Sequence, residues 1–322
     1  MTGTVLILGA NGRFGRAATQ AFAQNGWDVR AASRTGEGAH VAGVKGVACD
    51  VRNRKAVIEA AKGVDVIVHA INPPYPDWSE FLPIYSANII AAGLSSGATV
   101  MIAGNVYTFG KDAPVVLRED AAPTPSTRKG ALRVTMERTF ADAAQQGLRT
   151  IILRGGDFIE GTPTGNWFEN QMVNRVDKGM FTYPGRMDAV HAWAYLPDMG
   201  RAMAGLADKR HDLPMFSSFG FEGFSLTGVE LKAAVERAAG RSLKLKSMPW
   251  GILRLMGLFS PLMREVIEMR YLWNKPHRID GAPLQAILPD FQPTSLATAM
   301  VDALSLSQVS AGKPMISKTR TA

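Results

Sequence analysis

Short apolar runs recur through the first half of the chain, and longer stretches that mix apolar and polar positions separate them. Near-continuous apolar runs are typical of parallel strands that helices cover on both faces. Such runs predict strands at 5–8, 28–32, 47–49, 64–69, 99–102 and 148–153. The intervening stretches predict helices at 16–25, 53–61, 81–96 and 130–146. Five right-handed crossovers before residue 155 would give an α/β fold, a doubly wound parallel Rossmann sheet.

The pattern changes after residue 160, where tryptophan and glycine become more frequent. We expect residues 1–160 to form a Rossmann domain and residues 161–322 to form a smaller C-terminal substrate lobe. Residues from about 190 to 220 should return to the Rossmann sheet, with an added strand at 213–219. The polar stretch 313–322 is typical of a disordered terminus.

Residues 250–269 are apolar around most of a predicted helix. Arg254, Pro261, Arg264 and Glu265 interrupt the run, so it falls short of the twenty or so apolar residues of a membrane span. Ordinary packing is the simplest interpretation. A lid over a pocket, a homodimer face or a peripheral membrane contact also fits this pattern.

Three glycines spaced three apart, Gly9, Gly12 and Gly15, directly follow the first strand. A dinucleotide-binding turn needs glycine for the tight bend, for close backbone approach to a pyrophosphate and for helix-on-strand packing. The pyrophosphate would lie at a helix N-terminus, where free N–H groups and the helix dipole favour an anion. The sequence therefore predicts an NAD(P)-binding turn.

The end of the second strand bears on the choice between NADP and NAD. An NAD site usually places a carboxylate there for the ribose 2′-hydroxyl, whereas this chain has Ser33 and Arg34, with Arg13 as a second cation. These groups suit a 2′-phosphate, so we expect NADP, with NAD as the alternative. Arg34 would otherwise be a solvated loop residue.

Later strand ends supply the rest of the expected cofactor site, because ligands of open α/β sheets bind outside the carboxyl ends of the strands. Asp50 and the backbone of Val51 are placed to hold an adenine edge. The complete expected set is Gly9, Asn11, Gly12, Arg13, Phe14, Gly15, Ser33, Arg34, Asp50, Val51, Ala70, Ile71 and Asn72.

Composition narrows the function classes. The chain has 322 residues, of which 46% are hydrophobic and 20% charged, with a net charge of +8. The basic residues are scattered, so we expect no nucleic-acid partner. A single cysteine and an immediate first strand favour a cytoplasmic protein. His69 has no partner at metal-ligand spacing, so we expect a core histidine and no metal site.

With these motifs in place, the chain resembles the extended short-chain dehydrogenase/reductases, the NAD-dependent epimerase/dehydratase family. The resemblance covers nearly the whole length and implies a small-molecule substrate. Its motifs are the glycine turn, Asp50, the loop Ala70-Ile71-Asn72, Asn105-Val106-Tyr107, Arg154-Gly155-Gly156-Asp157-Phe158 and Tyr195-Leu196-Pro197-Asp198.

The family's catalytic serine, tyrosine and lysine do not match. The serine position falls on Ala103, and the tyrosine and lysine positions fall on Lys129 and Arg133. Arg133 can bind a ribose but cannot cycle its proton. Lys129 could donate a proton or bind an anionic substrate. Alternatively, both residues are solvated cations at a helix start.

Tyr107 is our first candidate for a substitute proton donor, because its strand end faces the ligand crevice. Equally, Tyr107 could only pack beneath the substrate and have no part in proton transfer. Tyr107 and Lys111 show the family's spacing, but on a loop, so we treat this as coincidence. The candidate catalytic residues are thus Tyr107, Lys129 and Arg133. The candidate substrate residues are Asn105, Trp167, His191 and Trp193, unless the aromatic ones only fill the core.

The sequence favours an NADP-dependent oxidoreductase or epimerase-like enzyme. It would transfer hydride to or from a small carbonyl or alcohol substrate with an unconventional proton donor. The mismatched catalytic positions leave an alternative from another class, a non-catalytic NAD(P)-binding sensor or regulatory protein.

Overall fold

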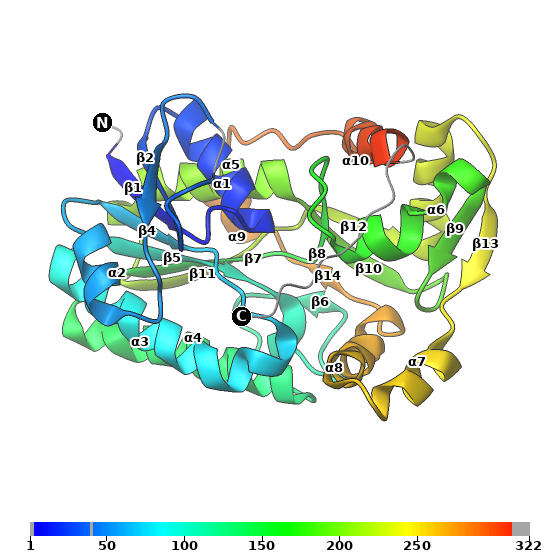
Figure 1. Ribbon diagram of the computed structural model, residues 1–322, viewed down its shortest axis with the longest axis horizontal. Helices are drawn as coiled ribbons and strands as arrows, with labels where there is room; N and C mark the ends of the chain where they lie inside the picture. Colours follow the sequence, from blue (N-terminus) through cyan, green and yellow to red (C-terminus); the bar gives the residue numbers. More distant parts are fainter. Residues whose placement is uncertain (1–2, 39–40, 311–322) are drawn as a thin grey trace.

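A seven-stranded parallel sheet forms the centre of the computed structural model, which describes residues 3–38 and 41–310 (Figure 1). The expected disorder at 313–322 lies outside these residues. The strand order is β11-β7-β5-β4-β1-β2-β3, which confirms the Rossmann prediction. The bounds are β1 (Thr4–Leu8), β2 (Asp28–Ser33), β3 (Lys45–Ala48), β4 (Val66–His69), β5 (Thr99–Gly104), β7 (Thr150–Arg154) and β11 (Phe216–Gly220).

Helices cover both faces of this sheet, as Figure 1 shows. On one face, α1 (Arg13–Gln24) packs against α5 (Leu196–Asp208) through Phe22 and Met203. The other face carries α2 (Arg54–Ala60), α3 (Trp78–Ser96) and α4 (Arg128–Ala143). Strands buried on both sides explain the near-continuous apolar runs of the sequence.

Two details of the predicted elements are wrong. Helix α1 begins at Arg13 and not at residue 16, because Gly12 already serves as its N-cap. The connection from β2 to β3 contains no helix in its described part, so four of the five expected crossovers carry one. The strand order reverses between β1 and β4. This reversal is the switch point at which such sheets bind ligands.

The rest of the chain builds a smaller lobe around a three-stranded sheet of β8 (Asp157–Ile159), β10 (Val190–Tyr195) and β12 (Phe224–Thr227). From the stretch 190–220, β10 lies in this small sheet, and α5 and β11 lie in the Rossmann unit. Two strand pairs complete the lobe: β9 (Met180–Tyr183) with β13 (Lys244–Ser247), and β6 (Val116–Leu117) with β14 (Arg278–Ile279).

Helices of the second half surround the small sheet. They are α6 (Gly228–Ala239), α7 (Trp250–Gly257), α8 (Pro261–Glu268), α9 (Ala282–Ile287) and α10 (Leu296–Ser310). The predicted apolar stretch 250–269 is thus two short helices, broken at Ser260-Pro261. Among the residues that the structure describes, no helix is long and apolar enough to cross a membrane.

Short helical turns link these elements. Single 3₁₀ turns span Tyr75–Asp77, Val106–Thr108, Ala144–Gln146, Val176–Lys178, Arg210–Asp212 and Met269–Trp273, and a π-helical turn spans Phe168–Val173.

Candidate active site

The glycine turn lies between β1 and α1, at the switch point of the sheet. Gly9 has a φ of +83°, a conformation that other residues rarely adopt. A Cβ on Gly15 would lie 2.1 Å from the carbonyl oxygen of Gly9, so a side chain there would displace the backbone. The turn therefore depends on glycine at both positions for its shape.

Helix α1 starts at this turn without a capping side chain. Gly12 offers no acceptor to the first-turn N–H groups, and the first turn holds no carboxylate. An anion satisfies such free donors and interacts favourably with the helix dipole. The residues present thus fit the pyrophosphate of a dinucleotide.

The end of β2 carries the residues that we expect to contact a 2′-phosphate. Arg34 is exposed and makes no hydrogen bond or ion pair with the described part of the chain. Ser33 Oγ donates to the carbonyl oxygen of Glu37 at 2.6 Å, and Asn11 Nδ2 donates to the same oxygen at 2.8 Å. These two side chains close the loop that presents Arg34.

Other expected cofactor residues have partners inside the protein. Arg13 Nη2 donates to the carbonyl oxygen of Gly165 at 2.7 Å, which ties the glycine turn to the C-terminal lobe. Asp50 accepts from Arg52 Nη2 at 2.6 Å, and this hydrogen bond lowers the pKa of the Asp50 carboxyl. Phe14 and Val51 are buried side chains of the core.

The loop after β4 meets both the glycine turn and α4. Ala70 N donates to the carbonyl oxygen of Leu8, and the Ile71 side chain lies against Gly9. Arg133 Nη2 donates to Asn72 Oδ1 at 2.8 Å. The fold thus brings together Asn72, which we expect to hold the cofactor, and Arg133, which stands at the position of the family's lysine.

Tyr107 lies on the 3₁₀ turn after β5, beside the same loop. Its hydroxyl shares a 2.9 Å hydrogen bond with that of Tyr75, and its ring stacks on Trp78 at 6.2 Å. Burial raises the pKa of Tyr107 well above its usual value and also raises the pKa of Tyr75. Both phenols therefore keep their protons at neutral pH. The sequence did not single out Tyr75, which lies on the 3₁₀ turn after the loop that follows β4.

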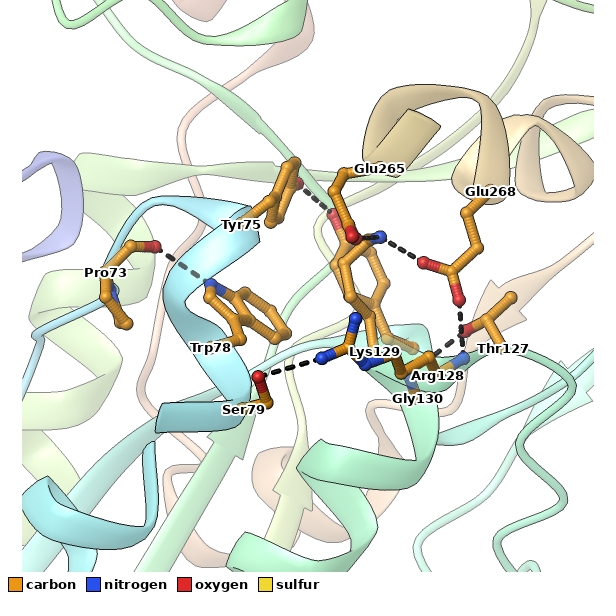
Figure 2. A network of polar contacts seen from close by, with 11 residues as sticks. Pro73, Tyr75, Trp78, Ser79, Thr127, Arg128, Lys129, Gly130, Glu265 and Glu268 are labelled. Carbon is orange, nitrogen blue, oxygen red and sulfur yellow. Dashed lines mark hydrogen bonds and ion pairs between the residues drawn. The ribbon is translucent and has the colours of Figure 1, made fainter. Parts of the chain in front are cut away.

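Lys129 is almost completely buried, with 1% of its surface exposed. Figure 2 shows it between Glu265 and Glu268 of α8, and its ammonium group forms ion pairs with both carboxylates. Arg133 is also buried, and its guanidinium lies 4.7 Å from the ring of Trp78. The alternative that Lys129 and Arg133 are solvated is wrong, because helices α3 and α8 cover the start of α4.

The expected substrate residues of the C-terminal half form an aromatic cluster. His191 Nε2 lies 2.7 Å from Asp157 Oδ2, and the His191 ring stacks on Trp273 at 4.3 Å. Trp193 lies 5.0 Å from His191. Trp167 packs on Trp273 at 5.5 Å. His191 therefore contacts a carboxylate and not a backbone group.

This cluster contains several buried polar atoms that have no partner in the described chain. They are His191 Nδ1, Trp193 Nε1, His277 Nε2 and Tyr183 Oη. Buried polar groups normally find a partner, so unpaired ones indicate a water or a ligand. Asp157 was not among the predicted site residues. It contacts His191 of the cluster, and its negative charge adds to the burial that raises the pKa of Tyr75 and Tyr107.

Asn105 orients Tyr107. Its Oδ1 accepts from Tyr107 N at 3.0 Å, and its carbonyl oxygen accepts from Arg154 Nη1 at 2.6 Å. Lys111 is exposed on the following loop and is not on a helix with Tyr107.

A separate hollow of about 460 Å³ lies between β10, β14 and α9. Its wall includes Asp198, Phe221, Glu222, Arg278 and Phe291, and none of the expected site residues. No group of three or more His, Cys, Asp or Glu side chains in the described part of the chain could hold a metal.

Comparison with known proteins identifies the family. The model of the NAD dependent epimerase/dehydratase family matches residues 5–215. The chain belongs to this family. No curated protein matches it. As a family member, the chain carries the NAD-binding Rossmann fold of the extended short-chain dehydrogenase/reductases.

Solved structures share the fold over almost the entire chain. A putative epimerase from Burkholderia cenocepacia J2315 aligns with a TM-score of 0.78 and 17% identity, over 96% of this chain and 99% of that one. UDP-glucose 4-epimerase from Brucella ovis, in complex with NAD, aligns with a TM-score of 0.74 and 16% identity, over 95% of this chain and 98% of that one. UDP-glucose 4-epimerase from Bifidobacterium longum, in complex with NAD⁺ and UDP, aligns with a TM-score of 0.73 and 14% identity, over 96% of this chain and 99% of that one. At such identities the likeness shows the fold alone.

Proposed function

We propose that this family member is an NADP-dependent oxidoreductase that acts on a carbonyl or alcohol group of a small substrate. The observation that carries this proposal is that Tyr107 and Arg133 both contact one side chain, Trp78. Arg133 also reaches Asn72 at the end of β4, next to the switch point. A proton-bearing hydroxyl thus lies near the residues expected to hold the nicotinamide ribose.

The glycine turn and the start of α1 would hold the pyrophosphate, and Arg34 with Ser33 would hold the 2′-phosphate. Asn72 and Arg133 would hold the nicotinamide ribose. When bound, the nicotinamide supplies or accepts the hydride. NADP is favoured over NAD because Arg34 is unpaired in the described chain and no carboxylate ends β2.

Tyr107 would donate the proton. Because its pKa is raised, Tyr107 is protonated at neutral pH and has no phenolate with which to accept a proton. A phenol is still acidic enough to protonate a developing alkoxide. Tyr75, within hydrogen-bond distance, can return a proton to it. Reduction of a carbonyl is therefore the favoured direction at neutral pH, and an epimerase-like cycle, which must first oxidise an alcohol, is the less favoured activity.

The substrate would lie between the tyrosine pair and the aromatic cluster of His191, Trp193 and Trp273. Similar structures bind UDP-glucose or UDP. In this chain Asp157 places a carboxylate beside the cluster, which disfavours a diphosphate. We therefore propose a small carbonyl compound without phosphate groups.

The test is a screen of aldehydes, ketones and sugar nucleotides for NADPH oxidation, followed by Tyr107→Phe. The variant should lose at least 100-fold in kcat with an unchanged NADPH affinity, because it lacks only the hydroxyl. Tyr85→Phe, a half-exposed tyrosine of α3, is the control. Full activity of Tyr107→Phe would overturn the assignment of Tyr107.

A non-catalytic sensor is the second candidate, and one observation favours it. Lys129 stands at the position aligned with the family's tyrosine, and two carboxylates of α8 fix it there. Tight NADPH binding without turnover on the whole panel would favour the sensor over the enzyme.

A further inference from the structure

The connected helices α7 and α8 expose an unusual amount of apolar surface. Phe259, in the turn between them, is 85% exposed, and Leu258 beside it is 68% exposed. The same surface includes further side chains that are about half exposed or more. The apolar patch consists of Ile252, Leu255, Met256, Leu258, Phe259 and Leu262. Contiguous exposed groups of this kind mark an interaction surface.

The helices that carry the patch are anchored on their inner side. Trp250 Nε1 donates to the carbonyl oxygen of Pro184 at 2.6 Å, and the Arg270 guanidinium lies 5.2 Å from the Trp250 ring. On α8, Glu265 and Glu268 point to Lys129, as Figure 2 shows. The exposed apolar side chains are thus presented outward by an anchored helix pair.

The sequence stretch that carries the patch has charges of one sign. Between residues 241 and 264 the chain contains no aspartate or glutamate. The exposed strand β13, helix α7 and helix α8 carry four basic residues in this stretch, and a fifth precedes β13. Both acids of α8 are engaged with Lys129. The basic residues are Arg241, Lys244, Lys246, Arg254 and Arg264.

This charge pattern discriminates between possible occupants. A second copy of the chain would meet the patch with the same patch across a two-fold axis. The basic residues of both copies would then be brought toward one interface, and like charges across an interface cost several kcal/mol. An anionic phospholipid surface instead offers negative headgroups to the basic residues and acyl chains to Phe259 and Leu258.

We propose that the α7–α8 patch docks the protein peripherally on a membrane that contains anionic phospholipid. Phe259 and Leu258 insert at the boundary between headgroups and acyl chains, and the basic residues from 241 to 264 contact the headgroups. This inference is independent of the proposed catalytic activity.

The test is sedimentation of the full-length protein with vesicles of mixed phosphatidylglycerol and phosphatidylcholine, against vesicles of phosphatidylcholine alone. We expect binding to the mixed vesicles, at least tenfold less binding to the neutral ones, and weakening by salt. The double variant Leu258→Asp/Phe259→Asp should lose at least tenfold in binding. Lys244→Glu/Lys246→Glu should lose binding to the anionic vesicles.

Val229→Asp, which changes an apolar residue of α6 that is 58% exposed, is the matched control and should bind like the wild type. Circular dichroism and light scattering of each variant show whether it is folded and monomeric. Absence of vesicle binding, binding that survives the double variant, or a dimer that the double variant dissociates would overturn the proposal.

Discussion

Burial decides the protonation of single side chains in this protein. His69 ends β4 in the core, and desolvation lowers its pKa to about 3. Neither ring nitrogen has a partner in the described chain. Its expected role as a core histidine agrees with this environment. The same effect, acting on acids, keeps Tyr75 and Tyr107 protonated.

His69 should make the fold sensitive to acid. The folded protein holds it neutral down to about pH 3, whereas the unfolded chain takes up its proton near pH 6.5. The unfolded state thus binds more protons in this window, so stability is present above pH 6.5 and falls by up to about 1.4 kcal/mol per pH unit below it.

His69→Leu should reduce this slope while leaving stability at pH 7 unchanged or higher, because it removes two unpaired buried polar atoms. Urea unfolding between pH 4 and 7 measures this slope, because that range lies between the pKa of His69 in the folded protein, about 3, and its pKa in the unfolded chain, 6.5. His211→Leu, at an exposed position, is the control. An unchanged slope in His69→Leu would show that this ring is not the acid-sensitive group.

Arg34 should set the preference for NADPH. Arg34→Ala removes the unpaired cation at the end of β2, so NADPH affinity should fall about tenfold, or about 1.4 kcal/mol, with NADH affinity unchanged. Arg138→Ala, an exposed arginine of α4, makes the same charge change elsewhere. Equal losses for NADPH and NADH would contradict a contact with the 2′-phosphate.

At the scale of elements, α4 and α8 are joined by the buried ion pairs of Lys129. Lys129→Met leaves Glu265 and Glu268 without their cationic partner, and we expect a loss of about 3 kcal/mol in unfolding free energy. Adding Glu265→Gln and Glu268→Gln should restore most of it, because the unpaired charges are then gone. Urea denaturation at pH 7 checks both. A stable single variant, or no recovery in the triple variant, would show that the pairs contribute little.

The elements also show what the sequence could reveal. The strands were predictable because each is an apolar run buried on both faces. The glycine turn was predictable because its shape requires glycine: a Cβ on Gly15 would collide with the backbone of Gly9. The burial of α4 was not predictable. Its charges look exposed in sequence, yet the partners of Lys129 lie 136 and 139 residues away. No local pattern reports such contacts.

At the scale of the whole molecule, the two halves meet at the glycine turn. Arg13 joins the turn to Thr164 and Gly165 of the C-terminal lobe, so the proposed cofactor region is hydrogen-bonded to that lobe. The apolar patch spans α7, the turn after it and the start of α8, and Glu265 and Glu268 of α8 face Lys129. Helix α8 therefore contributes both to the proposed docking surface and to the ion pairs that cover the start of α4.

The central claim is that the switch point binds NADPH, and titration of wild type and Gly12→Ala by calorimetry tests it most directly. Gly12 has an ordinary φ of −75°, and a Cβ there would lie 3.1 Å from the carbonyl oxygen of Gly9. Alanine should therefore cost about 1 kcal/mol in stability and shift the turn that would hold the pyrophosphate. We predict micromolar or tighter NADPH binding by the wild type and at least tenfold weaker binding by the folded variant. No binding by the wild type, or equal binding by both, would contradict the claim.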